Sequence, residues 1–260
     1  MSKAPAVDYA LQIIEFFASE NRELGISDVS HALSINKNAV SRILESLTEK
    51  NWLYVSDDQN KKWRFTLKPF SIMTAAIENQ DIVRIAEPAV SRVRDELGDS
   101  VYLGIKNGDS VQYLLHYDST MEVRISGRVG GMYPLNCSAP GKILLSYSDA
   151  SEVERFFSCG ATSRTGNTIT DAQTFAAEAQ RIRAQGYALD NEEFANGILC
   201  IALPVFNHKG EAVASVGISS LTIYDNVDSL ISKKYPVLKH ATDEISASLG
   251  YGIFHDKYTK

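Results

Sequence analysis

A few residues in this sequence have the types that nucleophilic catalysis requires. Cys200 is a candidate nucleophile, with His116 or His208 as its base and Asp190 or Glu193 as the group that orients the base. The spacing does not support this arrangement, because the histidines are expected in a hairpin strand and in a turn. A lone cysteine in a strand is typical of buried packing. We therefore expect no enzyme activity.

A metal site is not expected either. Its candidate ligands are Cys137, Cys200, His116 and Asp190, and no two of them share the short spacing that is typical of metal ligands. The cysteines number 3 and lack a CxxC pair, which argues against a disulfide scaffold and a zinc finger. Free cysteines are typical of the reduced cytoplasm, where we expect the protein to act. The sequence indicates no cofactor.

Residues 36–50 contain a different kind of chemistry, which is suited to nucleic acids. The helical spacing of Val40, Ile43, Leu44 and Leu47 predicts a helix with one apolar face. Its start carries side chains that reach phosphates and base edges, namely Asn36, Lys37, Asn38, Ser41 and Arg42. A shorter amphipathic segment at 26–33 and a tight turn at 34–36 precede this helix. The pair is typical of a helix-turn-helix, although a solvated surface helix shows the same pattern.

The segment that follows predicts a wing. Two β-prone runs, 52–55 and 61–65, flank a turn rich in Asp and Asn, which predicts a hairpin. The returning strand carries the densest basic cluster of the N-terminal part, Lys61, Lys62 and Arg64. Such side chains position a protein on the DNA backbone without reading its sequence. A solvated basic hairpin is the alternative interpretation.

Length and charge limit these interpretations. The chain has 260 residues, of which 44% are hydrophobic, enough for two domains with separate cores. No apolar run is long enough to cross a bilayer, so no membrane partner is expected. The formal net charge is −6, and residues 1–66 hold eight basic against nine acidic side chains. These values exclude a non-specific polyanion binder. Any DNA contact must come from basic side chains that cluster locally on the surface.

The rest of the chain predicts a connector and a second domain. We expect a winged helix-turn-helix at residues 1–68, a connector helix at 69–86, and a second domain at 87–260. Pro88 is predicted to lie in the first turn of a new helix that ends at Gly98.

Strands and helices are both expected in the second domain. The expected strands are 100–106, 110–117, 122–127, 200–206 and 212–219, and the expected helices are 170–185 and 227–249. Adjacent hairpins predict an antiparallel sheet with helices on one side, which is an α+β fold.

A small-residue segment leads into Pro140, which suits the first turn of a helix. The backbone N–H groups of Ala139, Gly141 and Lys142 would then be free to bind a carboxylate or phosphate. An ordinary tight helix start is the alternative. A second polar cluster comes from the acidic stretch 190–193 and the small-residue strand that begins at Cys200.

With these motifs in place, nearly the whole chain, from Val7 to about Gly250, resembles the IclR family of bacterial transcription regulators. The most specific match is the pattern Gly186-x3-Asp190-x2-Glu193-x6-Cys200-Ile201-Ala202-x2-Val205-Phe206-Asn207, which fits the family's signature at every fixed position. The blocks at 35–44, 61–65 and 140–142 also fall where the family has their equivalents. The resemblance implies a winged helix-turn-helix followed by a GAF/PAS-like effector domain.

The resemblance also implies partners and site residues. Members bind double-stranded DNA at two-fold operators as homodimers or dimers of dimers, and most control catabolic operons. By matching position, the effector-binding residues are Ser138, Ala139, Pro140, Asp190, Cys200 and Ser219, and the free-amide argument adds Gly141. Members with the Cys-Ser-Ala run at 137–139 include regulators of sugar-acid use, which favours a small organic acid as effector. We expect a repressor. An enzyme tethered to DNA and a ligand-independent oligomerisation module are the alternatives.

Overall fold

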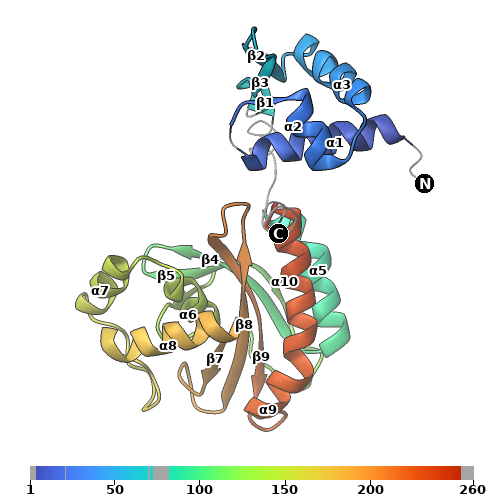
Figure 1. Ribbon diagram of the computed structural model, residues 1–260. Helices are drawn as coiled ribbons and strands as arrows, with labels where there is room; N and C mark the ends of the chain where they lie inside the picture. The colour runs from blue at the N-terminus through green and yellow to red at the C-terminus, as the bar shows by residue number, and fades with distance from the viewer. Residues whose placement is uncertain (1–3, 21, 70, 73–81, 253–260) are drawn as a thin grey trace. The chain divides into compact units, whose positions relative to one another are not determined.

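The computed structural model of the protein describes residues 4–20, 22–69, 71–72 and 82–252. The described chain divides into two compact units, an N-terminal unit at 4–72 and a C-terminal unit at 82–252 (Figure 1). Most of the predicted connector helix at 69–86 lies outside the described residues.

The N-terminal unit contains three helices and a small antiparallel sheet. The helices are α1 (Pro5–Glu20), α2 (Ile26–Leu33) and α3 (Lys37–Glu49). The strands are β1 (Leu24–Gly25), β2 (Leu53–Asp57) and β3 (Lys62–Phe65), in the order β1-β3-β2. Ser34, with a φ of 56°, makes the sharp turn between α2 and α3. The winged helix-turn-helix predicted from the sequence is confirmed.

The C-terminal unit is built on a six-stranded antiparallel sheet of order β6-β5-β4-β9-β8-β7. Its strands are β4 (Ser100–Asn107), β5 (Ser110–Tyr117), β6 (Met132–Pro134), β7 (Ala188–Asn191), β8 (Ile198–Phe206) and β9 (Ala212–Leu221). The helices are α5 (Ile82–Leu97), α6 (Ala139–Ser146), α7 (Ala150–Ser158), α8 (Ala172–Gln185), α9 (Val227–Ser229), a π-helical turn (Leu230–Lys234) and α10 (Tyr235–Ser248). The predicted α+β class is confirmed.

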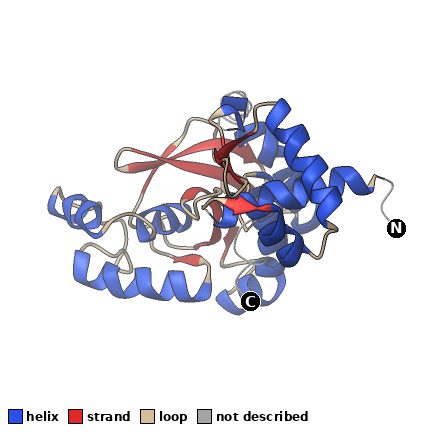
Figure 2. Ribbon diagram, turned by 45° about the horizontal axis from the view of Figure 1, so that its top comes forward, coloured by secondary structure: helices blue, strands red, loops and turns tan. Residues whose placement is uncertain are grey.

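Helices cover both faces of this sheet, so the prediction of helices on one side was wrong. Helices α5 and α10 lie on one face, and α6, α7 and α8 lie on the other (Figures 1 and 2). The physical reason is visible in β8, where every residue from Leu199 to Val205 is buried. Leu199, Ile201 and Leu203 belong to the core beneath α5 and α10, whereas Cys200 and Ala202 pack with α6. A strand that is buried on both sides needs cover on both sides.

Two local predictions were also wrong. Residues 122–127 are not a strand, because they belong to a loop at 118–131 that lies over the end of β4. The Ser100 hydroxyl donates to the Ile125 carbonyl at 3.0 Å, and the Gly127 N–H donates to His116 Nε2 at 3.1 Å. Side chains therefore satisfy backbone groups that a strand would have paired in a ladder.

Pro88 lies inside α5 and does not begin a new helix. A proline removes one backbone hydrogen bond and crowds the preceding turn, which costs about 3 kcal/mol in a helix interior. Burial of Ala86, Ala89, Val90 and Val93 on both sides of Pro88 offsets that cost and keeps the helix continuous.

Gly217 on β9 provides a test of this packing. A Cβ atom there would lie 2.6 Å from Tyr102 Oη and 2.7 Å from the Ile201 carbonyl oxygen. We expect Gly217→Ala to lower the free energy of unfolding by about 1–3 kcal/mol, because the neighbouring backbone has no room to yield. Urea titrations followed by circular dichroism measure this change. Gly166→Ala is the matched control, since nothing lies within 4 Å of its added Cβ, and equal effects of the two substitutions would contradict the prediction.

Candidate functional site

The start of α3 presents the polar residues that the sequence singled out. Val40, Leu44 and Leu47 are buried and hold the helix against the core of the N-terminal unit. Asn36 caps the helix, because its side chain accepts a hydrogen bond from the Asn38 N–H at 2.8 Å. The remaining polar side chains face solvent, with Asn36, Lys37, Asn38 and Arg42 exposed and Ser41 half-buried.

The two cations at this helix start are free to bind an anion. Within the described part of the chain, Lys37 and Arg42 form no ion pair. Ser41, by contrast, donates to Glu45 Oε1 at 2.9 Å on the following turn. The helix N-terminus adds a positive partial charge at the same end. Phosphate oxygens are the natural partners of such a surface.

The predicted wing residues have acidic partners in the folded unit. Lys62 Nζ lies 2.6 Å from Asp28 Oδ2 on α2, and this hydrogen bond lowers the pKa of Asp28. Arg64 lies 3.5 Å from a carboxylate oxygen of Glu23, and Lys61 lies 3.6 Å from one of Asp58. The ion pair between Lys62 and Asp28 joins β3 to the first turn of α2. Of the three basic residues, Lys62 therefore has the closest acidic partner within the fold.

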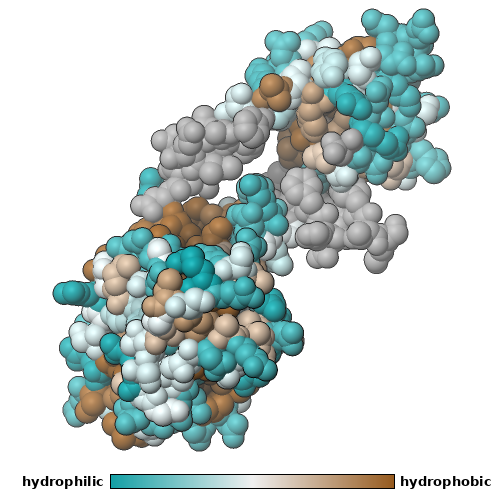
Figure 3. Space-filling model, turned by 90° about the vertical axis from the view of Figure 1, so that its left-hand side faces the viewer, coloured by the Kyte–Doolittle hydropathy of each residue, from teal (hydrophilic) through white to brown (hydrophobic). Residues whose placement is uncertain are grey.

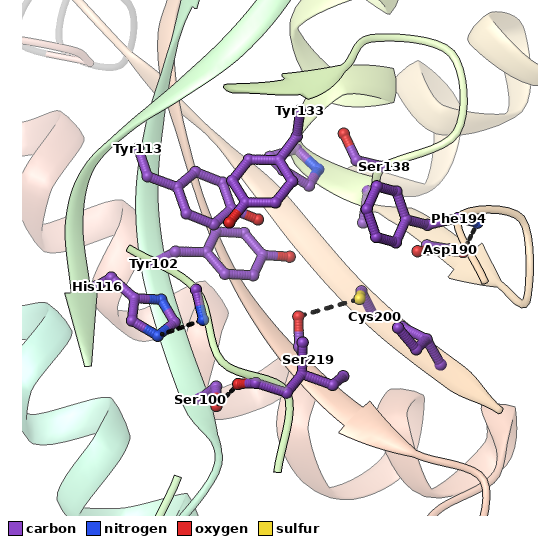
Figure 4. Close-up of a pocket in the computed structure, with 15 residues that line it drawn as sticks. Ser100, Tyr102, Tyr113, His116, Tyr133, Ser138, Asp190, Phe194, Cys200 and Ser219 are labelled. Atoms are coloured by element: carbon purple, nitrogen blue, oxygen red, sulfur yellow. Dashed lines mark hydrogen bonds between the residues drawn. The ribbon is translucent and has the colours of Figure 1, made fainter. Parts of the chain in front are cut away.

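A pocket of about 40 Å³ lies in the C-terminal unit between the sheet and the start of α6 (Figure 4). Six of the seven predicted effector-binding residues line it: Ser138, Ala139, Pro140, Asp190, Cys200 and Ser219. Gly141 does not line it. An added Cβ at Gly141 would lie 2.6 Å from the Pro134 carbonyl oxygen, so this glycine lets the preceding chain pack against α6.

Four polar residues of the pocket form one row across the sheet. Asp190 on β7 pairs with Cys200 on β8, Cys200 pairs with Ser219 on β9, and Ser219 pairs with Ser100 on β4. Cys200 Sγ lies 3.1 Å from Ser219 Oγ. Burial raises the pKa of the Cys200 thiol well above its ordinary value, so the group is a neutral thiol and not a thiolate nucleophile.

Asp190 is the buried carboxyl group of this row. Its Oδ1 accepts hydrogen bonds from the Glu193 and Phe194 N–H groups at 2.8 and 3.1 Å. Burial raises the pKa of Asp190 to about 6, although these backbone hydrogen bonds and the nearby Lys142 act to lower it. Both charge states of Asp190 are therefore accessible close to neutral pH.

The amides at the start of α6 are less available than the sequence predicted. The Gly141 N–H donates to Ser138 Oγ at 3.2 Å, and the Lys142 N–H donates to the Ser138 carbonyl at 2.9 Å. Of the three amides that we expected to be free, these two are engaged, which leaves Ala139. Ser138 Oγ also donates to the Pro134 carbonyl at 2.6 Å, so the serine is fully used as a helix cap.

Lys142 does not supply a cation to the pocket. Its side chain is 1% exposed, and its ammonium group pairs with Glu178 at 3.0 Å and with Glu193. Burial raises the pKa of Glu193 to about 7, while Lys142 acts to lower it. The three side chains form a buried cluster behind α6, and Glu178 also pairs with the exposed Arg181 at 2.6 Å.

The aromatic wall of the pocket was not predicted from the sequence. Tyr102 on β4 stacks on Tyr113 of β5 with ring centroids 4.6 Å apart, and Tyr113 stacks on Tyr133 at 4.2 Å. His116 and Phe194 also line the pocket. Tyr102, Tyr113 and Tyr133 lie on three different strands, so no spacing along one strand indicates that their rings meet.

No described residues form a metal site or a nucleophile–base pair with Cys200. Within residues 4–20, 22–69, 71–72 and 82–252, no group of three or more His, Cys, Asp or Glu side chains is placed to hold a metal ion. His116 contacts Gly127 and Asp118, and the exposed His208 lies in the turn between β8 and β9. Among the described helices, none is both long and apolar enough to cross a membrane.

Comparison with known proteins places both units in one family. Residues 6–57 match the IclR helix-turn-helix domain, and residues 74–247 match the domain described as bacterial transcriptional regulator IclR C-terminal. The HTH-type transcriptional regulator KdgR of Escherichia coli K12 is 33% identical over 235 residues, which cover 89% of this chain and 88% of KdgR. The HTH-type transcriptional repressor AllR of Salmonella typhi is 28% identical over 248 residues, covering 95% of this chain and 90% of AllR.

A solved structure supports the same fold. The crystal structure of the Agrobacterium tumefaciens repressor BlcR is similar to this chain with a TM-score of 0.81 and 24% identity, covering 96% of this chain and 99% of that one. The family matches span both units, and the identity to KdgR extends over most of both proteins. The chain therefore belongs to the IclR family of bacterial transcription regulators.

Proposed function

We propose that this protein is a cytoplasmic repressor of a catabolic operon, controlled by a small organic acid that binds in the C-terminal unit. The observation that carries the proposal is the pocket itself, in which the Asp190, Cys200 and Ser219 row meets the start of α6. The names of AllR and BlcR, both called repressors, favour repression over activation.

The N-terminal unit would contact DNA through two sets of side chains. Asn36, Lys37, Asn38, Ser41 and Arg42 at the start of α3 would enter the major groove, where such groups bond base edges and phosphates. Lys61, Lys62 and Arg64 would hold the backbone at the wing, with Lys62 contributing least because Asp28 already binds it. A two-fold operator requires paired recognition helices, and hence a homodimer or a dimer of dimers.

The size of the pocket suggests how an acid would act at a distance. About 40 Å³ accommodates a few water molecules, so an acid of several carbons has to move the side chains around it. The pocket-facing residues of β8 and β9 alternate with residues that pack beneath α5 and α10. A shift on one face of these strands therefore changes the packing of the helices on the other, which would alter the separation of the recognition helices.

Selection of genomic DNA fragments on the purified full chain tests the regulator function. We expect enrichment of a palindromic sequence at physiological salt, because sequence readout by paired helices yields half-sites related by two-fold symmetry. Sequencing of the retained fragments is the measurement. Loss of all enrichment, with and without a panel of organic acids, would refute the proposal.

Arg42→Ala tests the placement of α3. We expect roughly tenfold weaker binding to the selected fragment, because a base or phosphate contact of an arginine is worth about 1–3 kcal/mol. Fluorescence anisotropy at fixed salt measures this affinity. Lys50→Ala, at the opposite end of the same helix and also exposed, is the matched control. If the two variants bound DNA equally well, the recognition surface would lie elsewhere.

Asp190→Asn tests the buried carboxyl group through the pH dependence of stability. The folded-state pKa of about 6 lies above the ordinary 3.8, so the folded state holds a proton that the unfolded state has lost between about pH 4 and pH 6. The contribution of Asp190 to the free energy of unfolding therefore falls as pH rises through that window. A pKa difference of one corresponds to 1.36 kcal/mol, so the total fall is about 3 kcal/mol.

The variant lacks this titration but keeps an oxygen that accepts the Glu193 and Phe194 N–H groups. Its free energy of unfolding relative to the wild type should rise from pH 4 to pH 6 and stay level above pH 7. Urea titrations at several pH values measure the difference. Parallel curves for the two proteins would show that Asp190 does not titrate in this range.

A further inference from the structure

Much of the visible surface of the N-terminal unit is hydrophilic (Figure 3), so the sign of its charges decides where DNA is attracted. The wing formed by β2 and β3 is not a purely positive surface. Its three basic side chains stand beside four carboxylates, which belong to Glu23, Asp28, Asp57 and Asp58. A DNA phosphate that approaches the wing therefore meets carboxylates as well as cations.

Lys62 is directed across β1 toward α2. The pairing of β1 with β3 places Gly25 opposite Lys62. A Cβ at Gly25 would lie 3.4 Å from both Cδ and Nζ of Lys62, so the lysine crosses β1 at the residue that lacks a side chain. Its ammonium group then reaches Asp28, whose carboxylate also accepts the Gly25 N–H at 2.8 Å. Asp28 is thus held by the backbone, and the hydrogen bonds from Lys62 and from the Gly25 N–H lower its pKa and keep it ionised.

Arg64 is paired through the same strand register. Leu24 lies opposite Trp63, which brings the preceding residue, Glu23, beside Arg64, and Glu23 Oε1 lies 3.5 Å from Arg64 Nη2. The Ser56 hydroxyl on β2 shares its hydrogen between the other Glu23 oxygen, at 3.2 Å, and the Lys62 carbonyl oxygen, at 3.3 Å. Glu23 therefore has an anchor besides the arginine. Its negative charge stays at the wing when Arg64 turns to another partner.

The pair of Glu23 and Arg64 is exposed enough to exchange. The side chains are 42% and 49% exposed, and an exposed ion pair contributes little to stability. A phosphate can therefore replace Glu23 as the partner of Arg64, but Glu23 remains next to it. The two negative groups then lie within the Debye length of about 10 Å at 0.1 M salt, so salt does not remove their repulsion. The contact of Arg64 with DNA is weakened by a carboxylate that the fold itself supplies.

We propose that Glu23 and Asp28 keep the wing from binding DNA of arbitrary sequence. On unrelated DNA, where α3 makes no base contacts, Arg64 and Lys62 stay with their carboxylates. On the operator, base contacts of α3 provide the free energy for an exchange of partners, and the wing then holds the backbone. The inference rests on the proposed function, and it makes two carboxylates determinants of specificity although they contact no base.

Salt titrations of the full chain on a duplex of scrambled sequence test the proposal. The logarithm of the binding constant falls with the logarithm of salt concentration by about 0.9 for each phosphate contact. We expect Glu23→Gln to bind this duplex several-fold more tightly and to steepen the slope by about 0.9, because Arg64 gains a phosphate as its partner. Glu49→Gln, at an exposed position in the last turn of α3, makes the same change of net charge and should leave the slope unchanged.

An unchanged slope for Glu23→Gln, or the same steepening by Glu49→Gln, would overturn the proposal. A double variant shows whether the effect runs through Arg64. In an Arg64→Gln background, Glu23→Gln should no longer steepen the slope, and if it did, Glu23 would act only through the overall charge and the proposal would fail. Asp28→Asn keeps an oxygen for the Gly25 N–H and should steepen the slope through Lys62. No steepening by this variant would overturn the role of Asp28.

The operator fragment selected from genomic DNA completes the test. There Arg64 already contacts a phosphate in the wild type, so Glu23→Gln should keep the salt slope and raise the affinity less than it does on the scrambled duplex. An equal gain on both DNAs would overturn the role in specificity. If the wild type selects no fragment, the proposed function fails, while the slopes on the scrambled duplex still decide whether Glu23 restrains the wing.

Discussion

Burial of the central strands on both faces is the constraint on which the C-terminal unit depends. Large aliphatic residues of β8 and β9 point toward α5 and α10, where they form the main core. On the opposite face the same strands carry small residues, including Cys200, Ala202, Gly217 and Ser219. Small residues leave space beside α6, and Tyr102 fills part of it by lying on Gly217. The pocket is thus the space that remains where one face of a sheet is built from small side chains.

Electrostatics decides how that space can be used. Lys142, a cation within α6, pairs with Glu178 and Glu193, so its ammonium group is not free to pair with a ligand. The buried Asp190 then makes its end of the pocket a poor place for a second negative charge, unless the aspartate takes up a proton.

Local features of the fold were predictable because short-range rules determine them. Hydrophobic spacing and turn signals located α2, α3 and α8, the wing, and the hairpins β4–β5 and β8–β9. The errors have a common origin in long-range contacts. The 122–127 segment is β-prone, but Ser100 and His116 bind its backbone and keep it out of the sheet. The aromatic wall was missed for the same reason, since its rings meet only after distant strands pair.

The wing illustrates why a count of charges is a poor guide to a DNA surface. Three basic residues in five positions form the strongest electrostatic signal in the first 66 residues. In the folded unit each has an acidic neighbour, and two of these neighbours, Glu23 and Asp28, come from more than thirty residues earlier in the chain. Their pairing lowers the local positive potential, so fewer counterions are released on binding and the salt dependence should be shallow. We therefore expect specific binding to rely on the start of α3, where Lys37 and Arg42 form no ion pair with any described residue and the helix N-terminus adds its own positive end. An acidic regulator with this arrangement gains selectivity, because little attraction remains for DNA that lacks the correct bases.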